Sequence, residues 1–107
     1  MSRLLDLDGP LELTPLDPTA PAGTSPAAGS RALAAVAGAE VGVWEHSVGT
    51  STDTEADEVF VVLSGSASIA FDDGTVLDVR PGSAVRLHAG DKTVWTVHET
   101  LRKLYVC

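Results

Sequence analysis

The sequence predicts an all-β domain, either a sandwich or a small barrel, and three observations support this. From residue 58 onward, short apolar runs alternate with turn signals such as Asp73-Gly74, Pro81-Gly82 and Ala89-Gly90. The run Glu58–Leu63 consists mainly of β-branched and aromatic residues, and we expect Ser64-Gly65 to end it. After residue 40 no helical period of useful length is present. Short strands at this spacing are typical of sandwiches and small barrels.

The composition is that of one ordinary globular domain. The chain has 107 residues, of which 44% are hydrophobic and 21% charged. Its net charge of −8 argues against a nucleic-acid partner and against binding to an anionic membrane surface. The first residues lack the long apolar region of a signal peptide, and no apolar stretch of the sequence has membrane-spanning length, so we expect neither feature. The single cysteine, Cys107, excludes an intrachain disulfide, so we expect a cytoplasmic protein.

We divide the chain into an N-terminal part, residues 1–30, and a β-barrel domain, residues 31–107. Residues 1–13 alternate loosely between leucine and acidic residues, which predicts either a short strand at a sheet edge or a frayed terminus. Residues 14–30 are rich in Pro, Ala, Ser and Thr and contain two glycines. This composition predicts an extended segment that lies over the domain.

The next part of the chain contains two segments whose structure is less obvious. Residues 31–48 predict two strands joined at Gly38-Ala39, although the alanines of residues 31–37 also favour a helix. In the second of these strands, Trp44 and His46 share a face. Residues 49–57 predict a polar connection with solvated acidic side chains, because their spacing is not that of a calcium-binding loop.

The remaining strands are expected at residues 58–63, 66–71, 75–79, 84–87, 93–98 and 101–106. Because side chains alternate along a strand, Glu58 shares a face with Phe60 and Val62. Both faces of this first strand are apolar, so we expect it to be covered on both sides. A carboxylate on a covered strand is costly unless a partner holds it, which makes Glu58 the first candidate for chemistry.

Residues 41–106 resemble the cupins, a family with two short motifs. The first motif ends in a glutamate and, after six residues, a glycine, and Glu58 and Gly65 fit this end. In the second motif, Gly82 and Gly90 fit the two glycines, whereas His88 stands in place of the proline and Thr93 in place of the histidine. The resemblance implies a jelly-roll β-barrel, here with an extended N-terminal segment.

One branch of the cupins is especially similar, namely the small single-domain proteins related to the cupin domain of (S)-ureidoglycine aminohydrolase. The similarity is carried by Gly42–Glu45, Asp57–Gly65, Trp95 and Arg102–Val106. The resemblance implies a homodimer, formed through edge strands or the N-terminal arm. It also implies that a small polar molecule such as a ureido compound, an amino acid or a sugar is the partner.

The metal ligands of a typical cupin are mostly missing. Two histidines are expected among Ser51–Thr54, where none is present, and Thr93 takes the place of the third. Of the three-His, one-Glu set only Glu58 remains, whereas a transition metal needs three or four protein ligands. We therefore expect no metal and no cofactor, although His46 or His88 could rebuild a site.

The resemblance to cupins implies which side chains face into the interior of the barrel. We predict Glu58 and Lys103 as catalytic residues and Trp44, His46, Phe60, Thr93, Trp95 and Tyr105 as ligand-binding residues. The pair Glu58–Lys103 acts either as a general acid/base couple or substrate clamp, or only as an ion pair that orients the barrel. His98 alternates with Val97 and is expected to face outward.

These residues support one leading function and two alternatives. The leading hypothesis is metal-independent binding, or non-redox conversion, of a small polar metabolite inside the barrel. The first alternative is a metal-dependent cupin enzyme that uses Glu58 with His46 or His88. The second alternative is a non-catalytic regulatory or assembly module whose interior is filled by side chains.

Overall fold

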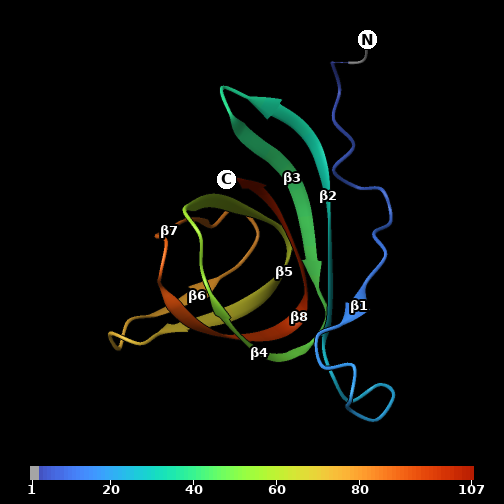
Figure 1. The fold of residues 1–107 in the computed structure, drawn as a ribbon, viewed down its shortest axis with the longest axis vertical. Coiled ribbons are helices and arrows are strands. Elements are labelled where there is room, and N and C mark those ends of the chain that lie inside the picture. The colour runs from blue at the N-terminus through green and yellow to red at the C-terminus, as the bar shows by residue number, and fades with distance from the viewer. Residues whose placement is uncertain (1–2) are drawn as a thin grey trace.

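The computed structural model describes residues 3–107 and confirms the predicted all-β architecture, a jelly-roll barrel (Figure 1). Within these residues the chain forms strands and turns, and no helix is present that could cross a membrane. The strands are β1 (Thr14–Pro15), β2 (Ala27–Val36), β3 (Ala39–His46), β4 (Gly49–Thr54), β5 (Glu58–Phe71), β6 (Val76–Val79), β7 (Ala84–Leu87) and β8 (Lys92–Val106).

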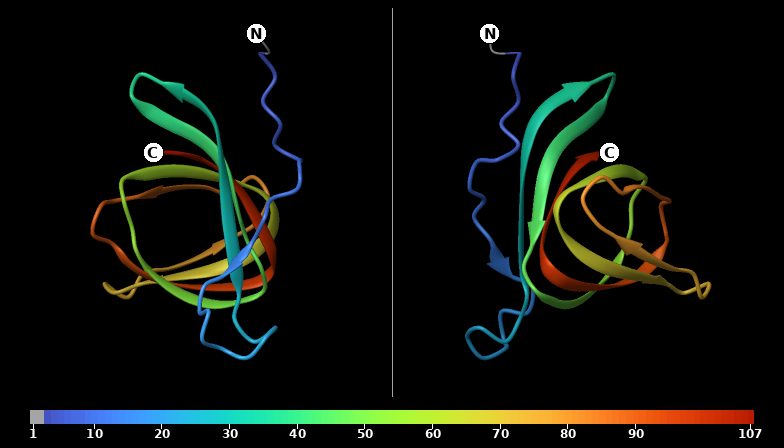
Figure 2. Two further views of the ribbon diagram at one scale, coloured as in Figure 1. Left: turned by 45° about the vertical axis from the view of Figure 1, so that its right-hand side comes forward. Right: turned by 180° about the vertical axis from the view of Figure 1, so that it is seen from behind.

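Two long antiparallel strands, β5 and β8, organise the barrel. They pair along most of their length, from Val59 opposite Val106 to Phe71 opposite Thr93. The other edge of β8 pairs with β3 at its C-terminal half and with β4 at its N-terminal half. In the same way, β5 pairs with β7 and then with β6. Because both long strands curve, the sheet wraps around one interior (Figure 2).

The continuity of β5 and β8 corrects the predicted strand boundaries. Ser64-Gly65 was expected to end a strand, but β5 continues to Phe71 with register shifts between Val62 and Ala67. Gly65 has a φ of 84°, which allows the strand to bulge and bend without ending. The segments predicted at 93–98 and 101–106 are likewise one strand, β8, which follows the same bend beside β5.

The hairpin of β2 and β3 resolves the ambiguity of residues 31–48. Two strands form, as predicted, and the alternative helix over residues 31–37 does not. The turn comprises Ala37 and Gly38, with φ values of 51° and 83°, and thus begins one residue before the predicted position. β2 pairs with β3 along nearly its whole length, and this pairing outweighs the helical preference of the alanines.

Strand β4 contradicts the prediction of a polar connection at residues 49–57. Residues 49–54 pair with β8 in regular antiparallel register, from Gly49 opposite Val97 to Thr54 opposite Lys92. This strand was not predicted because its side chains are polar and show no apolar alternation. Its backbone hydrogen bonds to β8 do not require an apolar face. The predicted strands at 84–87 and 75–79 are present, the latter beginning at Val76.

One hydrophobic core fills the part of the barrel away from its open end. It consists of the buried residues Phe60, Val62, Ala67, Ile69, Val79, Val85, Leu87, Trp95, Val97, Leu101 and Tyr105. The opposite face of β5 is only partly covered, because Val59 is 48% exposed. The expectation that this strand is covered on both sides is therefore wrong: the barrel encloses only its inner face.

The N-terminal segment runs beside the outer face of β2 (Figure 1). Residues 3–13 form no strand, and β1 is a two-residue pairing of Thr14 and Pro15 with Ala28 and Ala27. Arg102 holds the segment by donating hydrogen bonds to the carbonyl oxygens of Leu7 (2.9 Å) and Gly9 (2.7 Å). β2 begins at Ala27 and therefore spans the boundary that we placed after residue 30. The division of the chain into an N-terminal part and a barrel domain stays a prediction.

Candidate functional site

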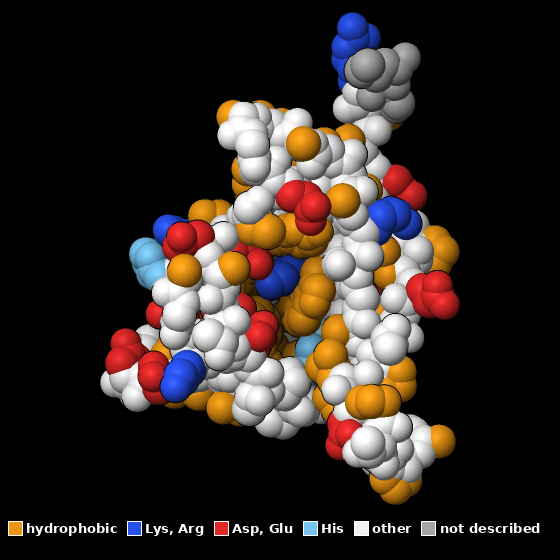
Figure 3. All heavy atoms as spheres, viewed as in Figure 1, with side chains coloured by type: hydrophobic (Ala, Val, Ile, Leu, Met, Phe, Trp, Pro, Cys, Tyr) orange, Lys and Arg blue, Asp and Glu red, His pale blue; other side chains and the backbone are white. Residues whose placement is uncertain are grey.

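The barrel contains a pocket of about 400 Å³, here called the cup, which opens on the face shown in Figure 3. Basic and acidic side chains and a histidine are visible inside it among apolar ones (Figure 3). Its walls come from β2, β3, β4, β5, β8 and the segments next to them. The lining residues are Leu16, Ala28, Ser30, Glu40, Trp44, His46, Ser51, Thr52, Asp53, Glu55, Glu58, Trp95, Lys103, Tyr105 and Cys107.

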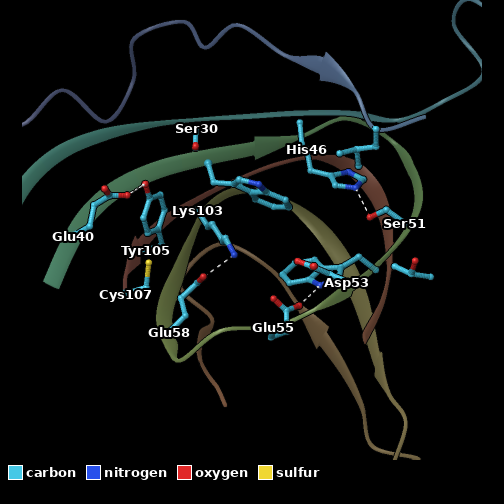
Figure 4. A pocket seen from close by; sticks show the side chains of 15 residues that line it. Ser30, Glu40, His46, Ser51, Asp53, Glu55, Glu58, Lys103, Tyr105 and Cys107 are labelled. Carbon is cyan, nitrogen blue, oxygen red and sulfur yellow. Dashed lines mark hydrogen bonds and ion pairs between the residues drawn. The ribbon is translucent and has the colours of Figure 1, made fainter. Parts of the chain in front are cut away.

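An ion pair between Glu58 and Lys103 lies in the middle of the cup (Figure 4). The Lys103 ammonium is 2.7 Å from the Glu58 carboxylate, and the two side chains are 7% and 15% exposed. The ammonium also lies 4.4 Å from the ring centroid of Phe60, 4.5 Å from that of Trp44 and 5.1 Å from that of Trp95. The lysine ammonium is thus held by one carboxylate and three aromatic rings.

The aromatic wall results from alternation on three neighbouring strands. Trp44 on β3, Phe60 on β5 and Trp95 on β8 all point inward, and the ring centroids of the two tryptophans are 5.5 Å apart. Trp95 also packs 5.7 Å from Phe60, which lies behind the surface of the cup. These rings provide apolar area beside the charged groups, a composition typical of small-molecule sites.

His46 is buried at one end of the cup and is held in one tautomer. Its Nδ1 lies 2.6 Å from the Ser47 carbonyl oxygen and its Nε2 lies 2.8 Å from the Ser51 hydroxyl. A carbonyl only accepts, so Nδ1 carries the proton and Nε2 accepts from Ser51. Burial lowers the pKa of His46, the Ser47 carbonyl opposes this, and the nearby charge of Lys103 lowers the pKa further. The imidazole is therefore neutral near pH 7.

Two acidic residues of the site, Glu55 and Asp53, were expected to be solvated, and this expectation is wrong for Glu55. The Glu55 side chain is buried, and one carboxylate oxygen accepts hydrogen bonds from the Thr93 hydroxyl (2.7 Å) and the Trp95 indole nitrogen (2.9 Å). Burial, followed by the negative charge of Glu55, raises the pKa of Asp53. Asp53 is more exposed but also lines the cup.

A further carboxylate, Glu40, faces Tyr105 at the other end of the cup (Figure 4). The tyrosine hydroxyl donates a hydrogen bond of 2.6 Å to Glu40. Burial and this hydrogen bond raise the pKa of Tyr105 to about 12, so the phenol stays protonated in neutral solution. The only donor of Tyr105 is therefore used on Glu40, and the residue contributes an apolar ring and a hydroxyl oxygen that can accept.

The alternation pattern predicts most inward-facing residues of the site. Trp44, His46, Glu58, Trp95, Lys103 and Tyr105 all line the cup, whereas Phe60 and Thr93 are buried behind it. Thr93 instead fixes the Glu55 carboxylate. His88 is exposed outside the cup, and His98 is exposed, as predicted, with its Nε2 3.1 Å from the Ser68 hydroxyl.

The residues at the metal positions of a typical cupin do not fit a metal ion here. Within residues 3–107, no three His, Cys, Asp or Glu side chains are grouped so that they could hold one. Glu58 binds the Lys103 ammonium, both ring nitrogens of His46 have partners, and the Thr93 hydroxyl donates to Glu55. The cation beside Glu58 is therefore supplied by a side chain of the chain itself.

Comparison with protein families identifies the EutQ-like cupin domain. The model of the EutQ-like cupin domain matches residues 33–105, which include β3 to β7 and nearly all of β8. A comparison with curated proteins gives no match.

Several solved structures have a similar fold. EutQ of Clostridium difficile is 23% identical over 78% of this chain and 69% of its own, with a TM-score of 0.67. A DUF861 family protein from Thermotoga maritima is 26% identical over 59% of this chain and 73% of its own, with a TM-score of 0.56. Ectoine synthase from P. lautus is 20% identical over 75% of this chain and 62% of its own, with a TM-score of 0.65. Identities at this level relate the folds and not the activities.

Proposed function

Because the chain belongs to the EutQ-like cupin domain family, we propose that it binds a small polar metabolite in the cup without a metal ion. The observation that carries this proposal is the Glu58–Lys103 pair inside an aromatic pocket of about 400 Å³. Buried ion pairs are poor stabilisers, because the loss of hydration offsets their attraction. We therefore expect an ion pair at the surface of a pocket to contribute more to ligand binding than to the stability of the fold.

Each group has a role in this proposal. Lys103 uses one of its three N–H donors on Glu58 and offers the others to an oxygen of the ligand. Glu58 accepts from a ligand N–H, or takes up a proton if the ligand is converted. Trp44, Trp95 and Tyr105 supply apolar area, and His46 and the more deeply buried Phe60 and Thr93 support them.

The resemblance of the sequence to the cupin domain of ureidoglycine aminohydrolase suggests which compounds to test. A panel of ureido acids, amino acids and monosaccharides is added to the purified protein, and the melting temperature is measured for each compound. A binder raises the melting temperature further as its concentration is raised above the dissociation constant, with a logarithmic dependence, because it stabilises only the folded state. If no compound of any class shifts the melting temperature, the proposal is wrong.

Glu58→Gln tests the role of the pair in binding. Glutamine keeps one oxygen for Lys103 but removes the charge, so we expect stability to fall by about 1–3 kcal/mol and ligand affinity to fall by about tenfold or more. Asp57→Asn is the matched control, because Asp57 forms the exposed pair with Arg86 and does not line the cup. Unchanged binding and stability in Glu58→Gln would show that the pair has no functional role.

Two further properties are proposed from the sequence alone. We propose that the protein is cytoplasmic, and that it forms a homodimer through edge strands or the N-terminal arm. Analytical ultracentrifugation of the full chain tests the second proposal: a single species of monomer mass at micromolar concentration would exclude the dimer.

A further inference from the structure

The cup has an excess of negative charge. Four carboxylates line it, from Glu40, Asp53, Glu55 and Glu58, against the single ammonium of Lys103. Within residues 3–107, Lys103 pairs only with Glu58, and no lysine or arginine pairs with the other three carboxylates. His46 adds no positive charge, since its tautomer is neutral. A ligand with a net negative charge is therefore disfavoured throughout the pocket.

The walls of the cup already stabilise a cation. The Lys103 ammonium lies within 5.1 Å of three aromatic ring centroids, an arrangement that is favourable for ammonium ions and unfavourable for carboxylates. Two of these rings, Trp44 and Trp95, also line the open volume. The same walls can therefore receive a second cation that comes from a ligand.

The carboxylate of Glu55 is preorganised to bind such a cation. Its side chain is buried, and its orientation is fixed by the donors of Thr93 and Trp95, so little freedom is lost on binding. Asp53 is on the same wall, and the repulsion between these two carboxyl groups contributes to the raised pKa of Asp53 (Figure 4). A positive charge placed between them relieves this repulsion.

We infer, on the basis of the proposed function, that the ligand is a small organic cation, with its ammonium or amidinium group bound by Asp53 and Glu55 beside Trp95. A neutral oxygen at the other end of the ligand accepts a hydrogen bond from Lys103, whose own charge is balanced by Glu58. The cup therefore selects amines and amidines that carry a carbonyl or hydroxyl oxygen, and it excludes carboxylic acids without a positive group.

Three small probes separate these features. Glycinamide carries an ammonium group and a neutral carbonyl, glycine has a carboxylate in place of the amide, and acetamide lacks the ammonium group. Binding is followed by tryptophan fluorescence, since the two tryptophans of the chain, Trp44 and Trp95, both line the cup. We expect glycinamide to bind most tightly, about tenfold or more above acetamide, with glycine weaker than glycinamide.

Two variants assign the charged contact. Asp53→Asn removes a carboxylate at an exposed position where no folding defect is expected, and should weaken glycinamide binding by about tenfold while acetamide binding is unchanged. Glu55→Gln should do the same, and its glutamine oxygen can still accept from Thr93 and Trp95. Asp72→Asn is the control, because it removes the same charge from an exposed residue outside the cup.

The outcomes distinguish this inference from the proposed function. If acetamide binds as tightly as glycinamide, or if Asp53→Asn and Glu55→Gln leave glycinamide binding unchanged, the cation inference is wrong and the binding function stands. If neither these probes nor any compound of the metabolite panel binds, both are wrong. Glycinamide binding that falls equally in Asp72→Asn would reflect only the overall charge of the protein, and would also overturn the inference.

Discussion

Tyr105 shows how the environment of the cup changes the chemistry of one side chain. It lies on the same face of β8 as Lys103, and its hydroxyl is 2.6 Å from a Glu40 oxygen. Burial and this neighbouring carboxylate disfavour the phenolate, so the pKa is raised to about 12. Because the pKa is raised on folding, the neutral phenol stabilises the protein below about pH 10, and this contribution is lost between about pH 10 and 12.

The ultraviolet absorbance of the phenolate tests this directly, because Tyr105 is the only tyrosine of the chain. We expect an absorbance titration with a midpoint of about 12 in the folded protein, checked by circular dichroism at each pH. In denaturant the midpoint should return to about 10. Glu40→Gln should lower the folded midpoint without bringing it to the denatured value, since burial is the larger cause. A folded midpoint near the denatured one would contradict the geometry of this end of the cup.

Alternation along the strands predicted which residues of the cup share a face where the strand itself was recognised. The period of two gave the shared faces of Glu58, Trp95 and the pair Lys103 and Tyr105, and the resemblance to cupins indicated which of these faces points inward. Glu55 could not be found in this way, because residues 49–57 have no apolar pattern and their pairing with β8 joins segments about 40 positions apart. The register between such distant segments is not contained in any local pattern.

At the scale of a strand, Gly65 lies at the register shifts where β5 bulges beside β8. A Cβ at this position would lie 2.0 Å from the Thr100 carbonyl oxygen, and the φ of 84° is unfavourable for any other residue. The sequence indicated a glycine at a strand end, yet a glycine signals a bulge as readily as a turn. Local sequence alone therefore could not show that β5 continues past it.

Gly65→Ala should destabilise the protein by more than about 2 kcal/mol, since it combines a strained φ with a clash against backbone. Gly74→Ala is the matched control, because Gly74 also has a positive φ, 92°, but an added Cβ there meets no atom within 4 Å. It should cost only about 1 kcal/mol. Urea unfolding of the three proteins gives the comparison. Equal losses in both variants would mean that the close approach to Thr100 is not a constraint.

At the scale of the whole molecule, the barrel was predictable and the N-terminal segment was not. The barrel follows from repeated strand and turn signals, which many residues supply independently. Residues 3–13 carry no such pattern, and their position depends on single contacts made by Arg31 and Arg102, far along the chain. Long-range contacts of this kind are invisible to an analysis of local sequence.

Arg102 joins this segment to the barrel, and its loss should release the segment without disturbing the cup. Its guanidinium pairs with Glu45 at 3.0 Å and donates to the carbonyl oxygens of Leu7 and Gly9. Since side chains alternate on β8, Arg102 points away from the interior that Lys103 enters. Arg102→Lys keeps the charge but loses the fork of donors that reaches both carbonyls. We expect faster hydrogen exchange in residues 4–13, with exchange in β5 and β8 and probe binding in the cup unchanged. The control is Arg80→Lys, at an exposed position outside this contact. If hydrogen exchange of residues 4–13 in Arg102→Lys is as slow as in the wild type, other contacts hold the segment.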